Sequence, residues 1–507
     1  MLLKSFLTGI LICTAFISGW GNKTGNQSSL DKPNILFILT DDQGYPTLGC
    51  YGGEIVPTPN LDKLAEGGAL FTDAYVTSQC TPTRATLLTG QYTARNRMWH
   101  VISWYGYPYA RMTEAGFKEN LDRSAFTIAK GLRAAGYTTG IFGKWHLTSN
   151  NDGNYRGLNP DAAHYYGFDF APPLLSDEEF EEGADRGVLT LTRQALRFIE
   201  DNKDEPWFCL LSHHMIHGKV VAPEELQQKY REKGYTGKDW NKPVYLAGLE
   251  QIDISVGKIM EGLKKSGELQ NTIVIFMSDN GGIDTRLNFR ALPVPNPEKP
   301  KLEPDMKEYD NAPLRAGKGS AYEGGVRVPF IVNWPGTIDE NLKINAPVHA
   351  VDIAPTLFAV AGAESEAPLD GENLLPLLNG KNMDYFENRP VFQYFPFYDL
   401  LWGLTPCATI RKGDYKLIEF FGDRFNAEDQ YVTGHQIELY NLKKDIGETT
   451  NLAEEESELA QELLTELHDW MERMNAPVSI RNPHFNPDSA FVSTREKPYW
   501  IKQRDGN

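Results

Sequence analysis

The sequence predicts an α/β fold: a large mixed, mostly parallel sheet sandwiched by helices, followed by a smaller C-terminal α+β subdomain built on a short antiparallel sheet. Three observations support this prediction. Apolar runs of strand character alternate with helical patterns, most runs end in polar residues, and the pattern changes after about residue 388. The 507 residues also suffice for one large domain and a smaller one.

Short apolar runs with β-branched character predict strands that are buried on both faces. They cover residues 34–39, 138–142, 207–211, 272–277 and 328–332. Helical patterns lie between them, at residues 61–69, 127–135, 188–202 and 245–267. This alternation predicts a doubly wound sheet, in which ligands bind beyond the carboxyl ends of the strands.

The C-terminal part has a different pattern. Residues 415–420 and 437–440 predict amphipathic strands. Residues 454–474 predict an amphipathic helix, and the acidic residues at its start suit the helix dipole. These features predict a small α+β unit with an antiparallel sheet.

Residues 1–20 contain one lysine followed by an apolar stretch, as in a secretory signal peptide, and residues 21–32 form a polar linker. The rest divides into an N-terminal domain, residues 33–387, and the subdomain, residues 388–507. The apolar stretch is short for a membrane span and no second candidate follows. We therefore expect an exported protein, periplasmic or secreted, without a membrane span. A lipid anchor at Cys13 is less favoured, because the small residues expected before a lipoprotein cysteine are missing.

The net charge of −18 argues against binding to nucleic acid. An anionic substrate would also meet a repulsive overall field, so its site would need clustered lysines and arginines. The hydrophobic fraction of 41% and the charged fraction of 23% are ordinary for a soluble globular enzyme.

Beyond the leader the chain contains the cysteines Cys50, Cys80, Cys209 and Cys407. In an exported protein, four cysteines allow three fully paired connectivities. If Cys80 is instead chemically modified, three remain and at least one stays free. In neither case is the chain a disulfide scaffold.

The pentapeptide Cys-Thr-Pro-Thr-Arg at residues 80–84 stands at the start of a predicted helix. Pro82 suits the first helical position, which places Cys80 at a helix N-terminus, where an anionic nucleophile or a bound anion is favoured. Arg84 adds a planar cation suited to tetrahedral oxyanions. A buried or disulfide-bonded structural cysteine is the alternative.

Oxygen-rich pairs follow two predicted strands: Asp41 and Asp42 after the first, and Asp279 and Asn280 after a later one. Acidic pairs at strand ends are commonly turns or caps. Two such pairs at one edge supply only oxygen ligands, which favours Ca²⁺ or Mg²⁺ over zinc. A cation would also keep clustered carboxylates ionised.

Basic residues follow other strands or lie in loops. Lys144 and His146 are two residues apart and share one face if the chain stays extended. Lys318 lies in a glycine-dense loop, residues 317–327, which would let it approach an anion closely; a flexible surface turn is the alternative. The run at 207–211 is followed by His213, His214 and His217.

Together these motifs resemble the type I, formylglycine-dependent sulfatases of the alkaline phosphatase superfamily. The similar segments are residues 33–44, 80–90, 143–147, 206–217, 279–282, 314–329 and 437–452. The resemblance implies hydrolysis of sulfuric esters by a formylglycine (3-oxoalanine) that a maturation enzyme makes from Cys80. In that family the aldehyde hydrate attacks the sulfur atom.

The resemblance also implies the roles of individual residues. The implied Ca²⁺ ligands are Asp41, Asp42, Asp279, Asn280 and the modified Cys80, with Mg²⁺ the less favoured ion. The implied sulfate-binding residues are Arg84, Lys144 and Lys318. His217 would protonate the leaving oxygen, and His146 would deprotonate the remaining hydroxyl so that sulfate leaves. His213 and His214 match no role in the family and are expected to be substrate-side or structural.

Two aromatic-rich segments, residues 97–107 and 395–398, are expected to be exposed and to pack on sugar rings. They favour a sulfated carbohydrate, a polysaccharide or its oligosaccharides, as substrate; sealing of the domain interface is their alternative role. The candidate substrate contacts are His100, Trp104, Arg286 and Arg290. The proline-rich, charged residues 291–313 are expected to form a surface insertion near the site.

Two other functions are alternatives. A phosphate or phosphonate ester hydrolase of the same superfamily would share the metal site, and parallel assays on aryl sulfate and aryl phosphate would separate the two. An inactive exported sugar-binding protein would require a broken set of site residues, and the set is intact.

Overall fold

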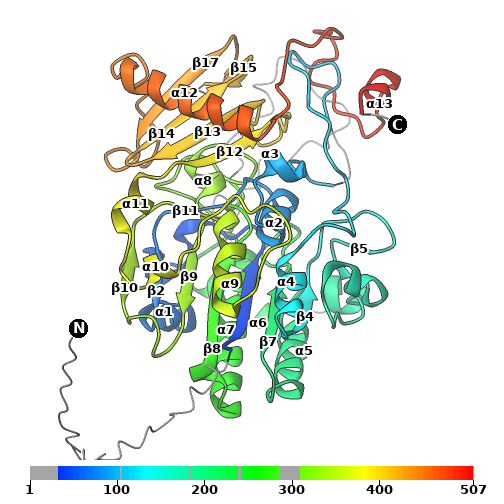
Figure 1. Cartoon of the computed structure of the whole chain (residues 1–507), viewed down its shortest axis with the longest axis vertical. Coiled ribbons are helices and arrows are strands. Elements are labelled where there is room, and N and C mark those ends of the chain that lie inside the picture. The colour runs from blue at the N-terminus through cyan, green and yellow to red at the C-terminus, as the bar shows by residue number, and fades with distance from the viewer. Residues whose placement is uncertain are drawn as a thin grey trace, which may run out of the picture.

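The computed structural model describes residues 32–102, 106–182, 185–237, 241–284, 309–426, 428 and 430–505. The predicted fold class is confirmed within these ranges. A seven-stranded sheet lies between two layers of helices, and a smaller four-stranded sheet lies at one end of it (Figure 1).

The large sheet has the strand order β10-β2-β9-β8-β1-β7-β4. Its strands are β1 (Asn34–Thr40), β2 (Ala69–Phe71), β4 (Thr138–Gly143), β7 (Trp207–Ser212), β8 (Thr272–Ser278), β9 (Phe330–Asn333) and β10 (Leu342–Ile344). Of these seven, β9 alone runs antiparallel to its neighbours, which makes the sheet mixed and mostly parallel. Because β4, β7, β1 and β8 are adjacent and parallel, their carboxyl ends meet at one edge.

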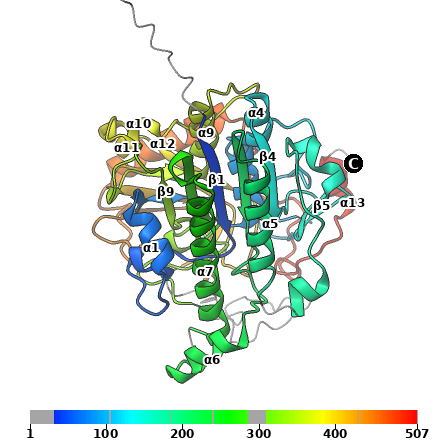
Figure 2. The same cartoon turned by 90° about the horizontal axis from the view of Figure 1, so that it is seen from below.

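Both faces of this sheet are buried, which explains why its strands read as continuous apolar runs. Along β1, Ile35, Phe37 and Leu39 belong to one core, and Leu36 and Ile38 belong to another. The first core is covered by α2 (Cys80–Thr89), α4 (Ile128–Ala134) and α9 (Ile353–Ala361). The second is covered by α1 (Pro59–Glu66), α5 (Val188–Asp201) and α7 (Pro243–Ser266). Figure 2 shows the two layers on opposite sides of the sheet.

The small sheet is antiparallel, with the order β12-β13-β14-β17. Its strands are β12 (Val391–Phe395), β13 (Cys407–Lys412), β14 (Tyr415–Phe420) and β17 (Gln436–Asn441). Helix α12 (Ser457–Arg473) packs on it, and Phe392 stacks on Trp470 with 4.6 Å between ring centroids. Tyr75 and Trp99 of the N-terminal part join the same core, so buried side chains seal the two sheets together.

Shorter elements connect these layers. The helices are α3 (Thr93–Asn96), α6 (Glu224–Glu232), α8 (Glu323–Val326), α10 (Leu375–Leu378), α11 (Met383–Asn388) and α13 (Tyr499–Asp505). The paired strands are β3 (Ala74–Tyr75) with β11 (Val348–His349), β5 (Gly153–Asn154) with β6 (Gly157–Leu158), and β15 (Asp423–Phe425) with β16 (Tyr431–Thr433).

The prediction that the aromatic segments are exposed is wrong. Trp99 and Tyr107 are 1% exposed and Phe397 is 2% exposed, and these rings belong to the cores of the subdomain and its contact with the large domain. Each ring has a large apolar area, and burying it in this contact is more favourable in free energy than exposing it to water. The alternative interpretation, sealing of the interface, therefore holds for the part of these segments that the structure describes.

The thiols of Cys50, Cys80, Cys209 and Cys407 are all free. None of the three connectivities that these four cysteines allow is formed. In the described ranges, no helix is both long enough and apolar enough to cross a membrane.

Candidate active site

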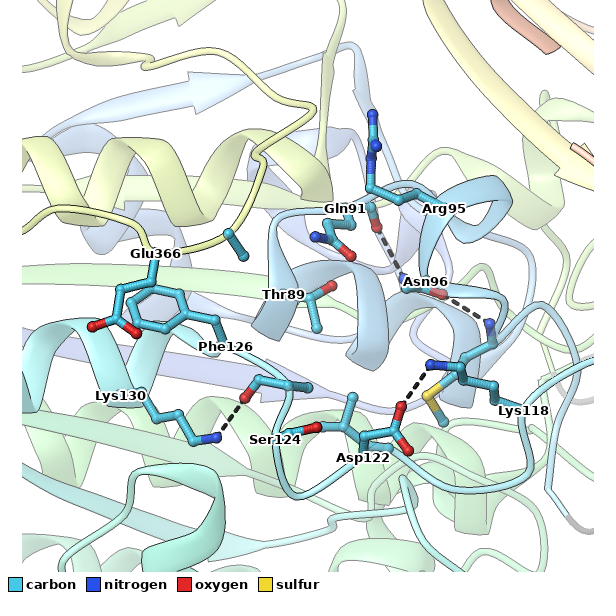
Figure 3. A pocket seen from close by; sticks show the side chains of 14 residues that line it. Thr89, Gln91, Arg95, Asn96, Lys118, Asp122, Ser124, Phe126, Lys130 and Glu366 are labelled. Atoms are coloured by element: carbon cyan, nitrogen blue, oxygen red, sulfur yellow. Dashed lines mark hydrogen bonds and ion pairs between the residues drawn. The ribbon is translucent and has the colours of Figure 1, made fainter. Parts of the chain in front are cut away.

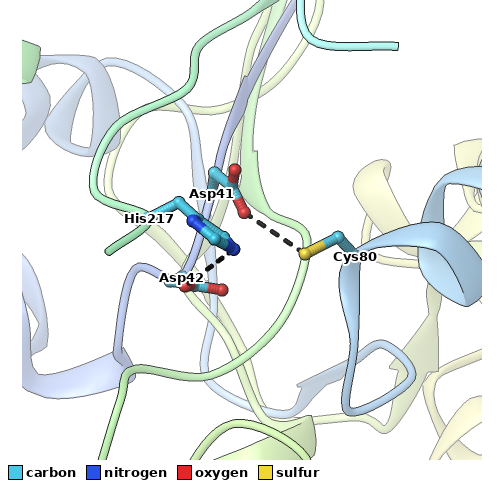
Figure 4. Close-up of side chains that lie close together, drawn as sticks. All are labelled: Asp41, Asp42, Cys80 and His217. Carbon is cyan, nitrogen blue, oxygen red and sulfur yellow. Dashed lines mark hydrogen bonds and ion pairs between the residues drawn. The ribbon is translucent and has the colours of Figure 1, made fainter. Parts of the chain in front are cut away.

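The common carboxyl edge of β1, β4, β7 and β8 brings the predicted site residues together. Asp41 and Asp42 follow β1, Lys144 follows β4, and the turn after β7 leads to His217. The ligand atoms of Asp41, Asp42, Cys80 and His217 all lie within 4.8 Å of one another (Figure 4).

Cys80 is the first residue of α2, after the extended residue Gln79. The prediction that Pro82 opens the helix is therefore wrong by two positions. Pro82 is the third helical residue, where it is tolerated because the first-turn N–H groups have no acceptor within the helix. The thiol still lies at a helix N-terminus and points toward Asp41, with 3.5 Å between Sγ and Oδ1 (Figure 4).

Glycines allow the loop that carries Lys318 to approach the end of β8. A Cβ atom on Gly281 would lie 1.8 Å from the carbonyl oxygen of Gly324, so only glycine fits there. The amide of Lys318 donates to the carbonyl of Gly282 at 2.8 Å. The glycine-dense loop is thus packed into the site rather than free at the surface.

Each carboxylate of the site is paired with a cation. Lys144 Nζ lies 2.5 Å from Asp41, Lys318 Nζ lies 2.8 Å from Asp42, and Arg84 lies 2.7 Å from Asp279. All six side chains are buried, the most exposed being Lys318 at 8%. We call these six residues the strand-edge cluster. It meets the requirement that an anion site in this acidic protein must concentrate cations locally.

The pairing separates the pKa values of the carboxylates. Burial alone would raise the pKa of Asp41, but the surrounding cations, Lys144 foremost, hold it well below its usual value. Burial and the neighbouring Asp41 raise the pKa of Asp279 to about 6, even though Arg84 opposes this. An additional cation would favour ionisation of all three carboxylates.

Asn280 supplies an oxygen that no described residue uses. Its amide nitrogen donates to Asp42 Oδ1 at 2.7 Å and to the carbonyl of Gly281 at 2.9 Å. Its Oδ1 atom is buried and has no hydrogen-bond partner. Buried oxygens are normally satisfied, so this one fits the role of a metal ligand.

The Cys80 thiol is a poor nucleophile as it stands. Burial raises its pKa to about 12, although Lys144 and Lys318 act in the opposite direction. The thiolate is the reactive form of cysteine. An unmodified Cys80 would therefore stay protonated and inert at neutral pH.

The two predicted proton-transfer histidines occupy different surroundings. His146 has a positive φ of 54°, so the chain is not extended there and simple alternation with Lys144 does not apply. Its Nε2 lies 3.3 Å from the carbonyl of Ile102, and burial with the nearby Lys144 puts its pKa well below normal. His217 Nε2 lies 3.9 Å from Asp42 Oδ2, and burial with the nearby Lys318 lowers its pKa to about 4.

Comparison with known proteins identifies the family of this chain. A family model described as Sulfatase matches residues 33–363, which is more than half of the chain. The chain belongs to the sulfatase family. A second model, described as N-sulphoglucosamine sulphohydrolase, C-terminal, matches residues 317–476. The protein is thus a sulfatase, an enzyme that hydrolyses sulfate esters.

Individual relatives agree with the family. Human arylsulfatase A is 30% identical, over 83% of this chain and 83% of its own length. A sulfatase from Formosa agariphila is 29% identical, over 94% of this chain and 95% of its own length. Among solved structures, Ps i-CgsB in complex with k-i-k-neocarrahexaose is 25% identical with a TM-score of 0.67, and the match covers 94% of this chain and 98% of that one.

Three further histidines of this sulfatase were singled out from the sequence. His213 is buried with Nε2 3.1 Å from Ser255 Oγ of α7, which indicates a structural role between sheet and helix. His214 is buried with its ring edge against Phe180 at 4.8 Å. His100 is 5% exposed and packs between the rings of Phe117 and Phe397. The predicted contacts Trp104, Arg286 and Arg290 lie outside the described residues, as do residues 291–308 of the predicted insertion.

Two further residues support the site, and neither was predicted from the sequence. Ser212, the last residue of β7, accepts a hydrogen bond from Arg84 at 2.6 Å and donates to the carbonyl of Lys144 at 2.8 Å. Arg186 Nη1 donates to the carbonyls of residues 217–219. Ser212 could have been found from the sequence, because it follows an apolar run at the end of a predicted strand. No sequence pattern points to Arg186.

A separate cavity of about 410 Å³ lies beyond the other end of α2 (Figure 3). Thr89 lines it, nine residues and about 14 Å along the helix from Cys80. Two of its lysines are engaged locally: Lys118 with Asp122 at 2.6 Å, and Lys130 with the carbonyl of Ala125 at 2.6 Å. Of the predicted site residues that the structure describes, none lines this cavity.

Proposed function

We propose that this sulfatase removes sulfate from a sulfated carbohydrate, using a formylglycine formed from Cys80 and a bound Ca²⁺. The observation that carries the proposal is the buried convergence of Cys80 with three carboxylates and three cations at one sheet edge. A sugar substrate is supported by the similarity to Ps i-CgsB, which was solved in complex with k-i-k-neocarrahexaose. Export of the mature protein from residue 21 onward is part of the same proposal, and N-terminal sequencing of the secreted protein would test it.

The side chains at the strand ends fit a calcium ion. Asp41, Asp42, Asp279 and Asn280 would hold it, because they offer only oxygen donors and one of these, Asn280 Oδ1, lacks a partner. When bound, the ion would supply positive charge that stabilises the charge developing on the sulfuryl oxygens. The nitrogen of His217 also lies within the group, but a nitrogen donor is not what Ca²⁺ prefers.

Lysine side chains of the strand-edge cluster would bind the sulfate group. Lys144 and Lys318 lie against Asp41 and Asp42, and these two carboxylates would be shared with the metal. Arg84 donates hydrogen bonds to Asp279, to Ser212 and to the carbonyl of Lys144, so its role would be to hold the cluster in place. Preorganised charges of this kind commonly supply the largest catalytic contribution.

His217 would donate a proton to the leaving oxygen. Its side chain is 37% exposed, so it borders the open side of the site. Its low pKa is due to burial and nearby Lys318, and an anionic substrate would act in the opposite direction and favour the protonated form. His146, whose pKa is held well below normal by burial and the nearby Lys144, would accept a proton from the nucleophile side.

Conversion of Cys80 to formylglycine would supply an aldehyde hydrate as nucleophile in place of an inert thiol. Mass spectrometry of the tryptic peptide that contains Cys80 tests this, using protein co-expressed with a formylglycine-generating enzyme. We expect the mass change of thiol-to-aldehyde conversion. An unmodified thiol in active enzyme would contradict the proposal.

Metal analysis of the purified enzyme tests the ion. We expect calcium at a ratio of one per chain, lost in Asn280→Ala and retained in Asn271→Ala, a matched change at an exposed asparagine. Zinc or no metal in the active enzyme would refute the calcium assignment, whatever the activity of the variants.

Phosphate or phosphonate esters are the alternative substrates. A phosphonate monoester hydrolase shares the fold with a TM-score of 0.62, but at 21% identity this likeness concerns the fold alone. We expect aryl sulfate to be hydrolysed faster than aryl phosphate in parallel assays.

A further inference from the structure

A tight turn of the subdomain reaches the catalytic edge. The turn runs from Asp399 to Leu404, whose amides and carbonyls bond to each other in both directions at 3.0 Å. The carboxylate of Asp399 accepts a hydrogen bond at 2.6 Å from Gln79, the residue immediately before Cys80. The turn is thereby tied to the start of α2.

The other side of the turn rests on the lysine loop. A Cβ atom on Gly319 would lie 2.4 Å from Trp402, so the indole packs directly on the Gly319 backbone. The amide of Gly319 in turn donates to the carbonyl of Ser78 at 2.7 Å. Lys318 Nζ lies 6.0 Å from the centre of the Trp402 ring. Trp402 is therefore held beside a sulfate-binding lysine by contacts on both flanks of the site.

Trp402 differs from the aromatic residues that the sequence predicted to contact sugar. Trp99, His100 and Phe397 are at most 5% exposed and cannot present a face to a ligand. Trp402 is only half-buried. Its indole lies against the Gly319 backbone and beside Lys318, so it provides an apolar surface next to a cation of the site.

We propose that Trp402 forms the wall of the subsite for the sugar ring that carries the sulfate, and that it sets the preference for carbohydrate sulfates. The inference rests on the proposed function and names the residue that recognises the sugar. A pyranose ring presents C–H groups on its faces, and these pack on an aromatic ring while its hydroxyls stay available for hydrogen bonds. A sulfate placed between Lys144 and Lys318 would leave its sugar next to the indole.

The test compares a sugar sulfate with inorganic sulfate, which occupies only the anion site. Wild type, Trp402→Ala and Trp402→Phe are assayed, in mature form, on galactose, N-acetylglucosamine and N-acetylgalactosamine monosulfates and on ι-carrageenan oligosaccharides. For each saccharide that wild type hydrolyses, we expect about a tenfold higher KM in Trp402→Ala and a partial return in Trp402→Phe. The inhibition constant of inorganic sulfate should stay unchanged.

The control is Trp334→Ala, a change at another half-buried tryptophan far from the site, which should leave KM unchanged. Unchanged KM in Trp402→Ala, or an equal loss of affinity for inorganic sulfate, would overturn the proposal. So would a wild type that hydrolyses aryl sulfates but no sugar sulfate. A wild type with no activity on any sulfate ester would instead refute the proposed function, so the two failures are distinguishable.

Discussion

Two clusters of buried charge differ in the polar atoms that lie beside them. The first is the strand-edge cluster beside Cys80. The second, the interface cluster, joins α8 and its neighbours to the small sheet. Its members are Asp73, Tyr75, Glu323, Arg327, Arg411, Lys416 and Glu448.

In the interface cluster every charge faces a partner. Lys416 Nζ lies 3.0 Å from Glu323 and 2.8 Å from Glu448, and Arg327 lies 3.1 Å from Asp73. None of the seven side chains has a buried polar atom without a hydrogen bond. The six charges of the strand-edge cluster are paired as well, but next to them Asn280 Oδ1 and His146 Nδ1 are buried without a hydrogen-bond partner among the described residues.

The comparison shows that burial of charge does not by itself mark an active site. A closed network holds a fixed geometry, and removing one member leaves another charge uncompensated. An open network keeps atoms available for a metal, a substrate or a proton. Mutations should therefore affect activity in one cluster and stability in the other.

Cys80→Ala should have the largest effect. Because the thiol contributes little packing volume, the variant should keep its melting temperature, while turnover falls by at least about 10⁴-fold. Cys407→Ala, at a buried free cysteine of the small sheet, is the matched control and should keep its turnover. Thermal unfolding and an aryl sulfate assay measure both; substantial turnover in Cys80→Ala would remove Cys80 from the chemistry.

Lys416→Ala, in contrast to Cys80→Ala, should lower the stability of the fold. It leaves Glu323 and Glu448 buried together without a cation, and we expect a loss of about 3–5 kcal/mol in the free energy of unfolding. Lys412→Ala removes a half-exposed pair with Glu466 and should cost less than about 1 kcal/mol. Urea unfolding compares the two. Equal stability of both variants would show that the interface cluster is not structural.

Glu114, which is buried where residues 107–114 meet Tyr398, should make the stability of the fold depend on pH. Its carboxylate accepts hydrogen bonds from the amides of Tyr107 and Tyr398 at 3.1 and 3.0 Å. Burial raises its pKa from 4.5 to about 7, against these donors and Arg504. The folded protein binds this proton more tightly than the unfolded chain does. The resulting contribution to the free energy of unfolding is complete below pH 4.5 and is lost as the pH rises through about 7, where the buried carboxylate must ionise.

Glu114→Gln stays neutral and should flatten this part of the pH profile. The wild type should lose up to about 3 kcal/mol of unfolding free energy between about pH 5 and pH 8 that the variant does not lose. Urea unfolding across this range provides the measurement. Parallel profiles for the two proteins would mean that Glu114 ionises normally.

Arg186→Ala should have the smallest effect. The guanidinium holds the carbonyls of residues 217–219 and lies 4.7 Å from the centre of the Phe180 ring, so its loss should displace His217 slightly. We expect about a tenfold lower kcat with little change in KM. Arg193→Ala, on the exposed side of α5, should have wild-type kinetics. A pure KM effect would indicate that Arg186 contacts substrate instead.

Much of this molecule could be predicted from its sequence because the relevant signals are local. Continuous apolar runs indicated strands buried on both faces, and the polar residues after them indicated the common edge. Parallel strands necessarily bring their carboxyl ends together, so the positions of Asp41, Lys144 and Asp279 after their strands were enough to predict that they lie near one another.

Other properties depend on contacts between distant segments, and these required the tertiary structure. No local pattern shows that Trp402 packs on Gly319 or that Arg186 reaches the carbonyl of His217. The aromatic segments looked exposed because their apolar partners lie elsewhere in the chain. Sequence by itself determined the sheet, its edge and the chemical types gathered there, since these follow from backbone periodicity. Tertiary packing alone decided which aromatic ring faces the site and which buried charges find partners, since burial is a property of the assembled fold.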